Sequence, residues 1–209
     1  MRKALLLALV SLFFFPSLSS AARPGSTGPS VARLNARLVS LGYLPYSFTS
    51  NSYGSQTTFA VTAFQKQVGL VRDGIAGPKT LTRLAHAVRP RPAFRGVGHR
   101  AEVSLSKQLL YLIHGNWVVR IIPISSGRPG LSTPAGSFAV YAKYLQSWSR
   151  PYSSWMPYAN YFHGGYALHG YPDSEVPAYP ASHGCVRIPM DFALEVYDFL
   201  RIGDAVRIH

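Results

Sequence analysis

The pattern of apolar residues changes abruptly near residue 100, and this change constrains the fold more than any other feature of the chain. Before that point, apolar residues recur at three- and four-residue steps, which is typical of amphipathic helices. After it, short apolar runs alternate with turns rich in Gly and Pro, which is typical of strands. We therefore predict a multi-domain chain: a small all-α three-helix bundle followed by a mostly-β, sandwich-like domain with one helix.

Residues 31–88 carry the helical pattern. Gly42 and Gly69 each follow one predicted helix, where a glycine commonly ends the last turn. Pro78 opens a third helix at its first position, where a missing N–H costs nothing. The apolar positions that define the pattern are Val31, Leu34, Leu38, Leu41, Ala60, Val61, Phe64, Val68, Leu81 and Leu84.

Residues 101–209 carry the strand pattern. The His-Gly-Asn turn at 114–116 is a hairpin signal between two β-rich runs. The one helix of this region is predicted over 191–201, with Asp191 as its cap. The predicted strands span 102–105, 108–113, 117–125, 137–144, 166–169 and 205–208.

The first 22 residues have the form of an export signal. Two basic residues precede an apolar stretch that stops at Pro16, and small residues follow it. The alternative is a membrane anchor, but the stretch is shorter than the roughly 20 residues that span a bilayer. We therefore expect a cleaved signal peptide (1–22), a short leader (23–30), no stable membrane span after cleavage, and a mature protein in the cell wall or periplasm.

The chain is strongly basic, with a formal charge of +13 from 21 basic and 8 acidic residues. Such a charge predicts an anionic partner. Export excludes nucleic acid as that partner and favours the cell envelope. The charge lies mainly outside residues 101–209, and residues 89–100, which hold four arginines and no acid, are predicted to be a basic Pro/Arg linker. Anionic wall polymers are therefore a candidate partner.

Cys185 is the single cysteine, so no disulfide within the chain and no zinc site of several thiolates can form. It lies in Ser-His-Gly-Cys-Val-Arg (182–187). A thiolate nucleophile needs a base and oxyanion donors. We expect Arg187 and two histidines to lower the thiol pKa. Gly184 allows a close approach of substrate to the backbone.

Two histidines compete for the role of base. His183 is two residues from Cys185, and in an extended segment both side chains would point to the same side. His169 ends a predicted strand further upstream. Spacing does not decide between them, and among the acids only the loop residues Asp173 and Glu175 are candidates to orient the base. A backbone carbonyl would serve instead.

Aromatic residues are dense between 144 and 166, interspersed with Pro and Ser. This composition predicts a loop that lines a cleft. Tyr158 lies within this segment, and we expect it to bind substrate.

Separated motifs in the second region resemble the L,D-transpeptidases, the YkuD-type domain. They are Ser-Thr-Pro-Ala-Gly-Ser-Phe (132–138), Met-Pro-Tyr-Ala-Asn-Tyr-Phe-His-Gly-Gly-Tyr-Ala-Leu-His-Gly (156–170) and Ser-His-Gly-Cys-Val-Arg (182–187). The resemblance covers 101–209. Residues 31–86 resemble the three-helix peptidoglycan-binding domain, through Leu-Gly-Tyr (41–43), Tyr-Gly-Ser-Gln-Thr (53–57), Ala-Val-Thr-Ala-Phe-Gln-Lys (60–66) and Asp-Gly-Ile-Ala-Gly-Pro-Lys-Thr-Leu (73–81).

The resemblance implies a role for each residue of the motif. Cys185 would be the nucleophile and His169 the general base, oriented by the Gly170 carbonyl. His183 and Ser182 would shape the site, with Ser182 and Arg187 in contact with substrate. The N–H groups of Gly184 and Cys185 would form the oxyanion hole, and neither a metal nor an organic cofactor would be needed.

The implied reaction is acyl transfer between peptidoglycan stem peptides. Cys185 would attack the third residue of a tetrapeptide, release D-Ala, and pass the acyl group from a thioester to a neighbouring stem, which gives a 3→3 cross-link for wall biogenesis. Water as acceptor would give an L,D-carboxypeptidase, and carbapenems would acylate Cys185. The alternatives are a wall-binding protein with an inactive β domain, and a different cysteine peptidase, in which the base usually lies downstream of the cysteine.

Overall fold

The computed structural model describes residues 21–171 and 176–209. Most of the predicted signal peptide, and the loop acids Asp173 and Glu175, lie outside these residues. Of the helices within the two described stretches, none combines the length and the apolar character needed to cross a membrane.

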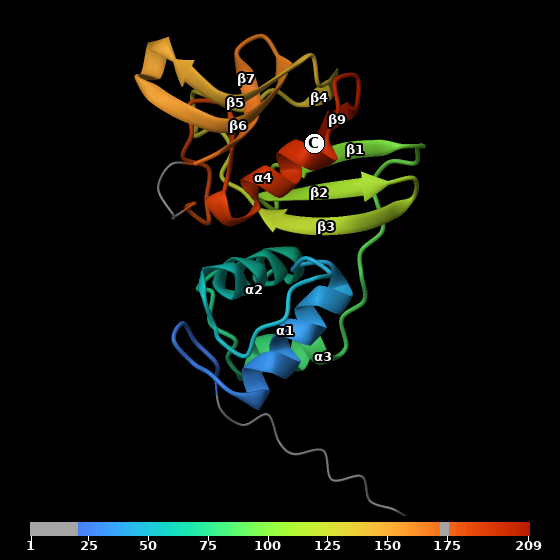
Figure 1. Ribbon diagram of the computed structural model, residues 1–209, viewed down its shortest axis with the longest axis vertical. Coiled ribbons are helices and arrows are strands. Elements are labelled where there is room, and N and C mark those ends of the chain that lie inside the picture. The colour runs from blue at the N-terminus through green and yellow to red at the C-terminus, as the bar shows by residue number, and fades with distance from the viewer. Residues whose placement is uncertain (1–20, 172–175) are drawn as a thin grey trace, which may run out of the picture.

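The N-terminal region is a three-helix bundle, as the spacing predicts (Figure 1). Gly42 and Gly69 both adopt the left-handed conformation and end the first two helices, which confirms their predicted role. Pro78 occupies the first turn of the third. Leu38 and Phe64 are fully buried between the helices. The helices are α1 (Pro29–Leu41), α2 (Ser55–Val68) and α3 (Pro78–Ala85).

The C-terminal region is mostly β, as predicted, and its strands form two mixed sheets. One sheet has the order β3-β2-β1-β9-β4, in which β1 and β9 run parallel. The other has the order β5-β6-β7-β8, in which β7 and β8 run parallel. The strands are β1 (His99–Ser104), β2 (Leu109–His114), β3 (Trp117–Pro123), β4 (Gly136–Ala139), β5 (Ala142–Ser149), β6 (Ser154–His163), β7 (Tyr166–Gly170), β8 (Val186–Ile188) and β9 (Ala205–Ile208).

The predicted single helix is α4 (Met190–Phe199), which packs in the same core as both sheets (Figure 1). Phe192, Ala193 and Val196 form its buried face. The helix begins at Met190 after Pro189, so Asp191 lies in the first turn and the prediction that it caps the helix is wrong. It ends at Phe199 because Leu200 is already extended.

Two predictions for residues 137–166 are wrong. The predicted strand 137–144 is two strands, because the chain crosses from one sheet to the other at the buried Val140, which exchanges backbone hydrogen bonds with the turn at 203–204. The predicted aromatic loop is the β5–β6 hairpin, closed by the 3-10 turn η1 (Arg150–Tyr152). Its aromatic rings pair across strands, as Trp148 and Trp155 do at 5.1 Å.

The bundle and the five-stranded sheet share one apolar core. Leu38 and Phe64 belong to the same buried cluster as Leu109 and Ile121 of the sheet. Figure 1 shows α2 lying against β3 and β2. The ammonium group of Lys66, on α2, is buried and donates to the carbonyls of two residues beside the sheet, at 3.2 and 2.8 Å. The bundle is therefore held in one orientation against the β domain.

Candidate active site

A cleft of about 430 Å³, partly open to solvent, lies where β7 and β8 face the β5–β6 hairpin. Five of the predicted site residues meet in it, although they come from separate parts of the sequence: His169, Ser182, His183, Cys185 and Arg187. The other residues that line it are Ser149, Tyr152, Ser154, Met156, Gly165 and Tyr171.

His169 is held in one orientation at the end of β7. Its Nδ1 lies 2.7 Å from the carbonyl oxygen of Gly170. A carbonyl can only accept a hydrogen bond, so Nδ1 carries the proton and Nε2 keeps a free lone pair. Gly170 leaves room for α4, because a Cβ at this position would lie 2.7 Å from the Met190 sulfur.

Burial keeps His169 neutral. The side chain is 5% exposed, and burial, with the nearby Arg187 guanidinium, lowers its pKa to about 4. Arg187 lies directly across from His169 in the β7–β8 register. At neutral pH the imidazole therefore carries no charge and can accept a proton at Nε2.

Cys185 follows a tight turn that Ser182 holds closed. The Ser182 hydroxyl accepts the N–H of Gly184 at 3.0 Å and donates to the carbonyl of Cys185. Gly184 has φ +118, and a Cβ there would lie 2.3 Å from the Tyr166 ring. Only glycine therefore fits between the turn and Tyr166.

The peptide unit between Gly184 and Cys185 is oriented by Thr133, whose role the sequence did not reveal. The buried Thr133 hydroxyl accepts the N–H of Gly127 at 2.9 Å and donates to the Gly184 carbonyl at 2.7 Å. The N–H of a trans peptide points opposite to its carbonyl, so the Cys185 N–H points away from Thr133. Among the described residues this N–H has no backbone or side-chain acceptor.

The Cys185 thiol is half-buried and donates to the Gly165 carbonyl at 3.8 Å. Burial raises its pKa, and a backbone hydrogen bond at Ala167 together with the Arg187 charge offsets only part of that rise. The expectation that its neighbours lower the thiol pKa is therefore wrong: desolvation outweighs the one nearby cation, and the histidines are neutral. The resting pair is a thiol and a neutral imidazole.

His183 is placed differently from His169. Its Nε2 lies 2.9 Å from Nη1 of Arg128, and its ring stacks on Tyr152 at 4.2 Å. A guanidinium can only donate, so the Nε2 lone pair of His183 is already used. Burial, with Arg128 and Arg187, lowers the pKa of His183 as well. Arg128 is a further residue that the motif did not indicate. Tyr152 belongs to the aromatic segment that was predicted to line a cleft, and this part of that prediction is confirmed.

Arg187 lies in the cleft, whereas Tyr158 lies outside it. The Arg187 guanidinium lines the cleft over the Tyr171 ring, 4.1 Å from its centroid. Tyr158 instead packs against Tyr197 at 6.1 Å and is not among the cleft residues, so the structure does not bring it to the site. Within the described residues, no three His, Cys or acidic side chains gather as a metal site requires.

Two family models match the chain. Residues 98–208 match the L,D-transpeptidase catalytic domain, YkuD, and residues 27–84 match a putative peptidoglycan-binding domain. Among curated proteins, a probable N-acetylmuramoyl-L-alanine amidase of Bacillus licheniformis is 41% identical over 66 residues, which is 31% of this chain and 19% of the amidase. The chain thus spans about a fifth of that relative.

Solved structures give the longest match. An L,D-transpeptidase from Xylanimonas cellulosilytica is 38% identical, with a TM-score of 0.81 over 93% of this chain and 100% of that one. An L,D-transpeptidase from Stackebrandtia nassauensis shares the fold at 24% identity, with a TM-score of 0.56 over 90% and 94% of the two chains. The site described above therefore lies in a fold shared with known L,D-transpeptidases. This chain belongs to the L,D-transpeptidase (YkuD) family, with an N-terminal peptidoglycan-binding domain.

Proposed function

We propose that this protein is an exported enzyme that forms 3→3 cross-links between peptidoglycan stem peptides through a thioester on Cys185. One observation carries the proposal: His169, neutral and fixed by the Gly170 carbonyl, leaves Nε2 free in the cleft that also holds the Cys185 thiol. A nucleophile and an unoccupied base in one cleft are what acyl transfer requires.

His169 is the general base in this proposal. The lone pair of His183 is occupied by Arg128, so His183 would have to lose that contact before it could accept a proton. His183 instead shapes the cleft wall, between Tyr152 and Arg128. Ser182 has a similar positioning role, because its hydroxyl holds the turn that carries Cys185.

In the acylation step, Nε2 of His169 takes the thiol proton while the sulfur attacks the carbonyl carbon of the third stem residue. The raised thiol pKa and the lowered imidazole pKa make this transfer unfavourable before substrate binds, so it accompanies the attack. The imidazolium then gives its proton to the leaving amine, free D-Ala departs, and the acyl group remains on sulfur.

In the second half of the reaction, the thioester is attacked and the thiolate becomes the leaving group. The side-chain amine of the third residue in a neighbouring stem attacks the thioester, His169 accepts its proton, and the thiolate leaves and is reprotonated. The product is an amide between two third residues. Water in place of the amine gives a tripeptide, which is L,D-carboxypeptidase activity at the same site.

In this proposal, one backbone N–H stabilises the oxyanion of the tetrahedral intermediate. The Cys185 N–H points away from Thr133 and carries no other acceptor among the described residues. The Gly184 N–H already donates to Ser182, so we assign the oxyanion to Cys185 alone. Arg187, which lines the cleft, supplies a positive charge for a substrate carboxylate.

Export and retention complete the proposal. Residues 1–22 direct secretion, and the peptidoglycan-binding bundle with its basic linker holds the enzyme against an anionic wall, in the cell wall or periplasm. The excess of basic over acidic residues in 23–100 supports this location, because attraction to fixed anions raises the local concentration of the enzyme.

Mature protein incubated with disaccharide-tetrapeptides tests the proposal. We expect dimers joined between third residues, identified by tandem mass spectrometry, together with released D-Ala. Cys185→Ala should form neither product. Dimer formation by Cys185→Ala would refute the mechanism, and tripeptides without dimers would show a carboxypeptidase.

A further inference from the structure

A second groove lies outside the catalytic cleft, between the segment 89–95 and the turn that joins β2 to β3. Its volume is about 1050 Å³, including space open to solvent. It shares no residue with the cleft. The residues that matter in it are Arg89, Arg91, Phe94, Arg95, Asn116 and Trp117.

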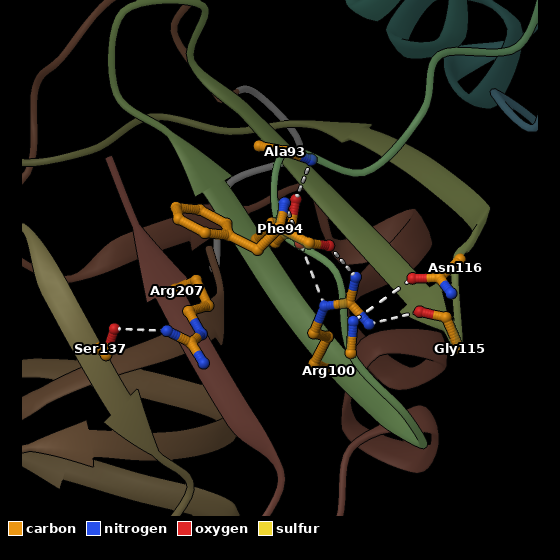
Figure 2. A network of polar contacts seen from close by, with 9 residues as sticks. Ala93, Phe94, Arg100, Gly115, Asn116, Ser137 and Arg207 are labelled. Carbon is orange, nitrogen blue, oxygen red and sulfur yellow. Dashed lines mark hydrogen bonds and ion pairs between the residues drawn. The ribbon is translucent and has the colours of Figure 1, made fainter.

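The backbone on one side of the groove is fixed by a buried ion pair (Figure 2). Arg100 and Glu102, whose side chains are 4% and 1% exposed, pair at 3.1 Å. The Glu102 carboxylate accepts the N–H groups of Ala93 and Phe94, and Arg100 donates to the carbonyls of Phe94 and Gly115. The segment is therefore tied to β1 and to the β2–β3 turn.

Two more contacts hold this segment. The Asn116 side chain, on the turn, accepts the N–H of Gly96 at 3.3 Å. The Arg207 guanidinium lies 5.5 Å from the centre of the Phe94 ring and donates to Ser137, as Figure 2 shows. The basic segment is thus a preformed wall of the groove, and binding there does not have to order a flexible chain.

The groove carries a net positive charge. The Arg89 guanidinium already donates hydrogen bonds to backbone carbonyls of α1 and β3. Arg91 and Arg95 are exposed, and neither guanidinium has a hydrogen-bond or ion-pair partner in the described stretches of the chain. Glu102 is the acid of this region, and Arg100 already neutralises it.

An exposed tryptophan lies beside these charges. Trp117 is 60% exposed, and the Arg89 guanidinium lies over its ring, 5.1 Å from the ring centroid. A flat, fixed indole offers an apolar face to the C–H groups of a sugar ring, and guanidinium groups match carboxylates and phosphates. The groove thus combines a stacking surface with two free cations.

We propose that this groove binds an anionic polysaccharide, with a sugar ring on Trp117 and its carboxylate or phosphate on Arg91 and Arg95. The inference rests on the proposed wall location, and it adds a binding site separate from both the catalytic cleft and the helical bundle. The match of residues 27–84 to a peptidoglycan-binding domain favours a wall glycan over nucleic acid.

Fluorescence anisotropy of labelled polymers tests this site without any catalytic step, so its failure is distinct from failure of the proposed reaction. The probes are polygalacturonate, a poly(N-acetylmannosamine phosphate), neutral dextran and a single-stranded oligonucleotide. The variants are Trp117→Ala and the double change Arg91→Ser, Arg95→Ser. The matched control is Arg23→Ser, Arg201→Ser, which removes the same charge from exposed positions outside both the helical bundle and the groove.

We expect one or both anionic polysaccharides to bind, and the stronger one identifies carboxylate or phosphate as the ligand group. The double change should weaken binding about fivefold at low salt, and less as salt rises. Trp117→Ala should weaken it about tenfold at every salt concentration, because stacking is not screened. Turnover on soluble muropeptides should not change in either variant.

Three outcomes would overturn the proposal. Equal loss in the control and in Arg91→Ser, Arg95→Ser would show general charge attraction. Dextran binding as tightly as the anionic polymers would remove the role of the arginines. Tighter, Trp117-dependent binding of the oligonucleotide would assign the groove to nucleic acid.

Discussion

Replacing Thr133 by valine should nearly abolish turnover while the protein stays folded. Valine has almost the shape of threonine but no hydroxyl, so the change removes two hydrogen bonds and little packing. The bonds lost are those to the Gly127 N–H and the Gly184 carbonyl, at 2.9 and 2.7 Å. Both partners are buried.

The magnitude follows from these two bonds. Each buried backbone group left unpaired costs about 1–3 kcal/mol, so for the two groups we expect the free energy of unfolding to fall by roughly 2–6 kcal/mol. The Gly184–Cys185 peptide loses its anchor, and the Cys185 N–H no longer points reliably into the cleft. Removal of one oxyanion donor costs about 100- to 1,000-fold in kcat.

The assay is steady-state kcat on a soluble disaccharide-tetrapeptide, with thermal unfolding measured in parallel. Thr133→Ser is the matched control, because it keeps the hydroxyl and loses only a methyl group. It should retain most of the activity. A folded Thr133→Val variant with more than half of the wild-type kcat would refute the reasoning, as would a Thr133→Ser variant that is equally impaired.

Four further predictions concern single groups. His169→Gln should lower kcat at least about 100-fold, whereas His183→Gln should cost no more than about tenfold, as initial rates would show. Because the pKa of His169 is lowered, the unfolded chain binds more protons than the folded chain between pH 4 and 6.5. The free energy of unfolding, measured by chemical denaturation, should therefore rise by about 3 kcal/mol across that window. His169→Gln should flatten this rise. Burial lowers the pKa of Lys66 to about 7, so stability should rise from pH 7 to 10, and Lys66→Met should remove this slope. Gly184→Ala should lower both Tm and kcat, because the new methyl group meets the Tyr166 ring; a normal Tm would contradict this.

Local patterns predicted most of the fold. Gly42, Gly69 and Pro78 act on the residues next to them, so the helix ends could be read directly. The break between β4 and β5 could not, because it depends on Val140 pairing with a turn more than sixty residues later. The aromatic residues were assigned to a loop because their density with Pro and Ser hid the cross-strand alternation.

The candidate site was predicted in part. Residues within one motif, such as Ser182 and Cys185, were identified together because they are neighbours in sequence. Thr133 and Arg128 were missed, because their contacts with the 182–185 turn bridge about fifty residues. The direction of the Cys185 pKa was predicted wrongly, because nearby cations are visible in a sequence and burial is not.

The central claim is that Cys185 carries the acyl group and His169 moves the proton. Intact-protein mass spectrometry after mixing with a tetrapeptide donor and quenching in acid tests both. We expect a mass increase equal to the donor without D-Ala, located on Cys185 by peptide mapping, and about 100-fold slower in His169→Gln. An adduct at any other residue, or one that forms equally fast in His169→Gln, would contradict the mechanism.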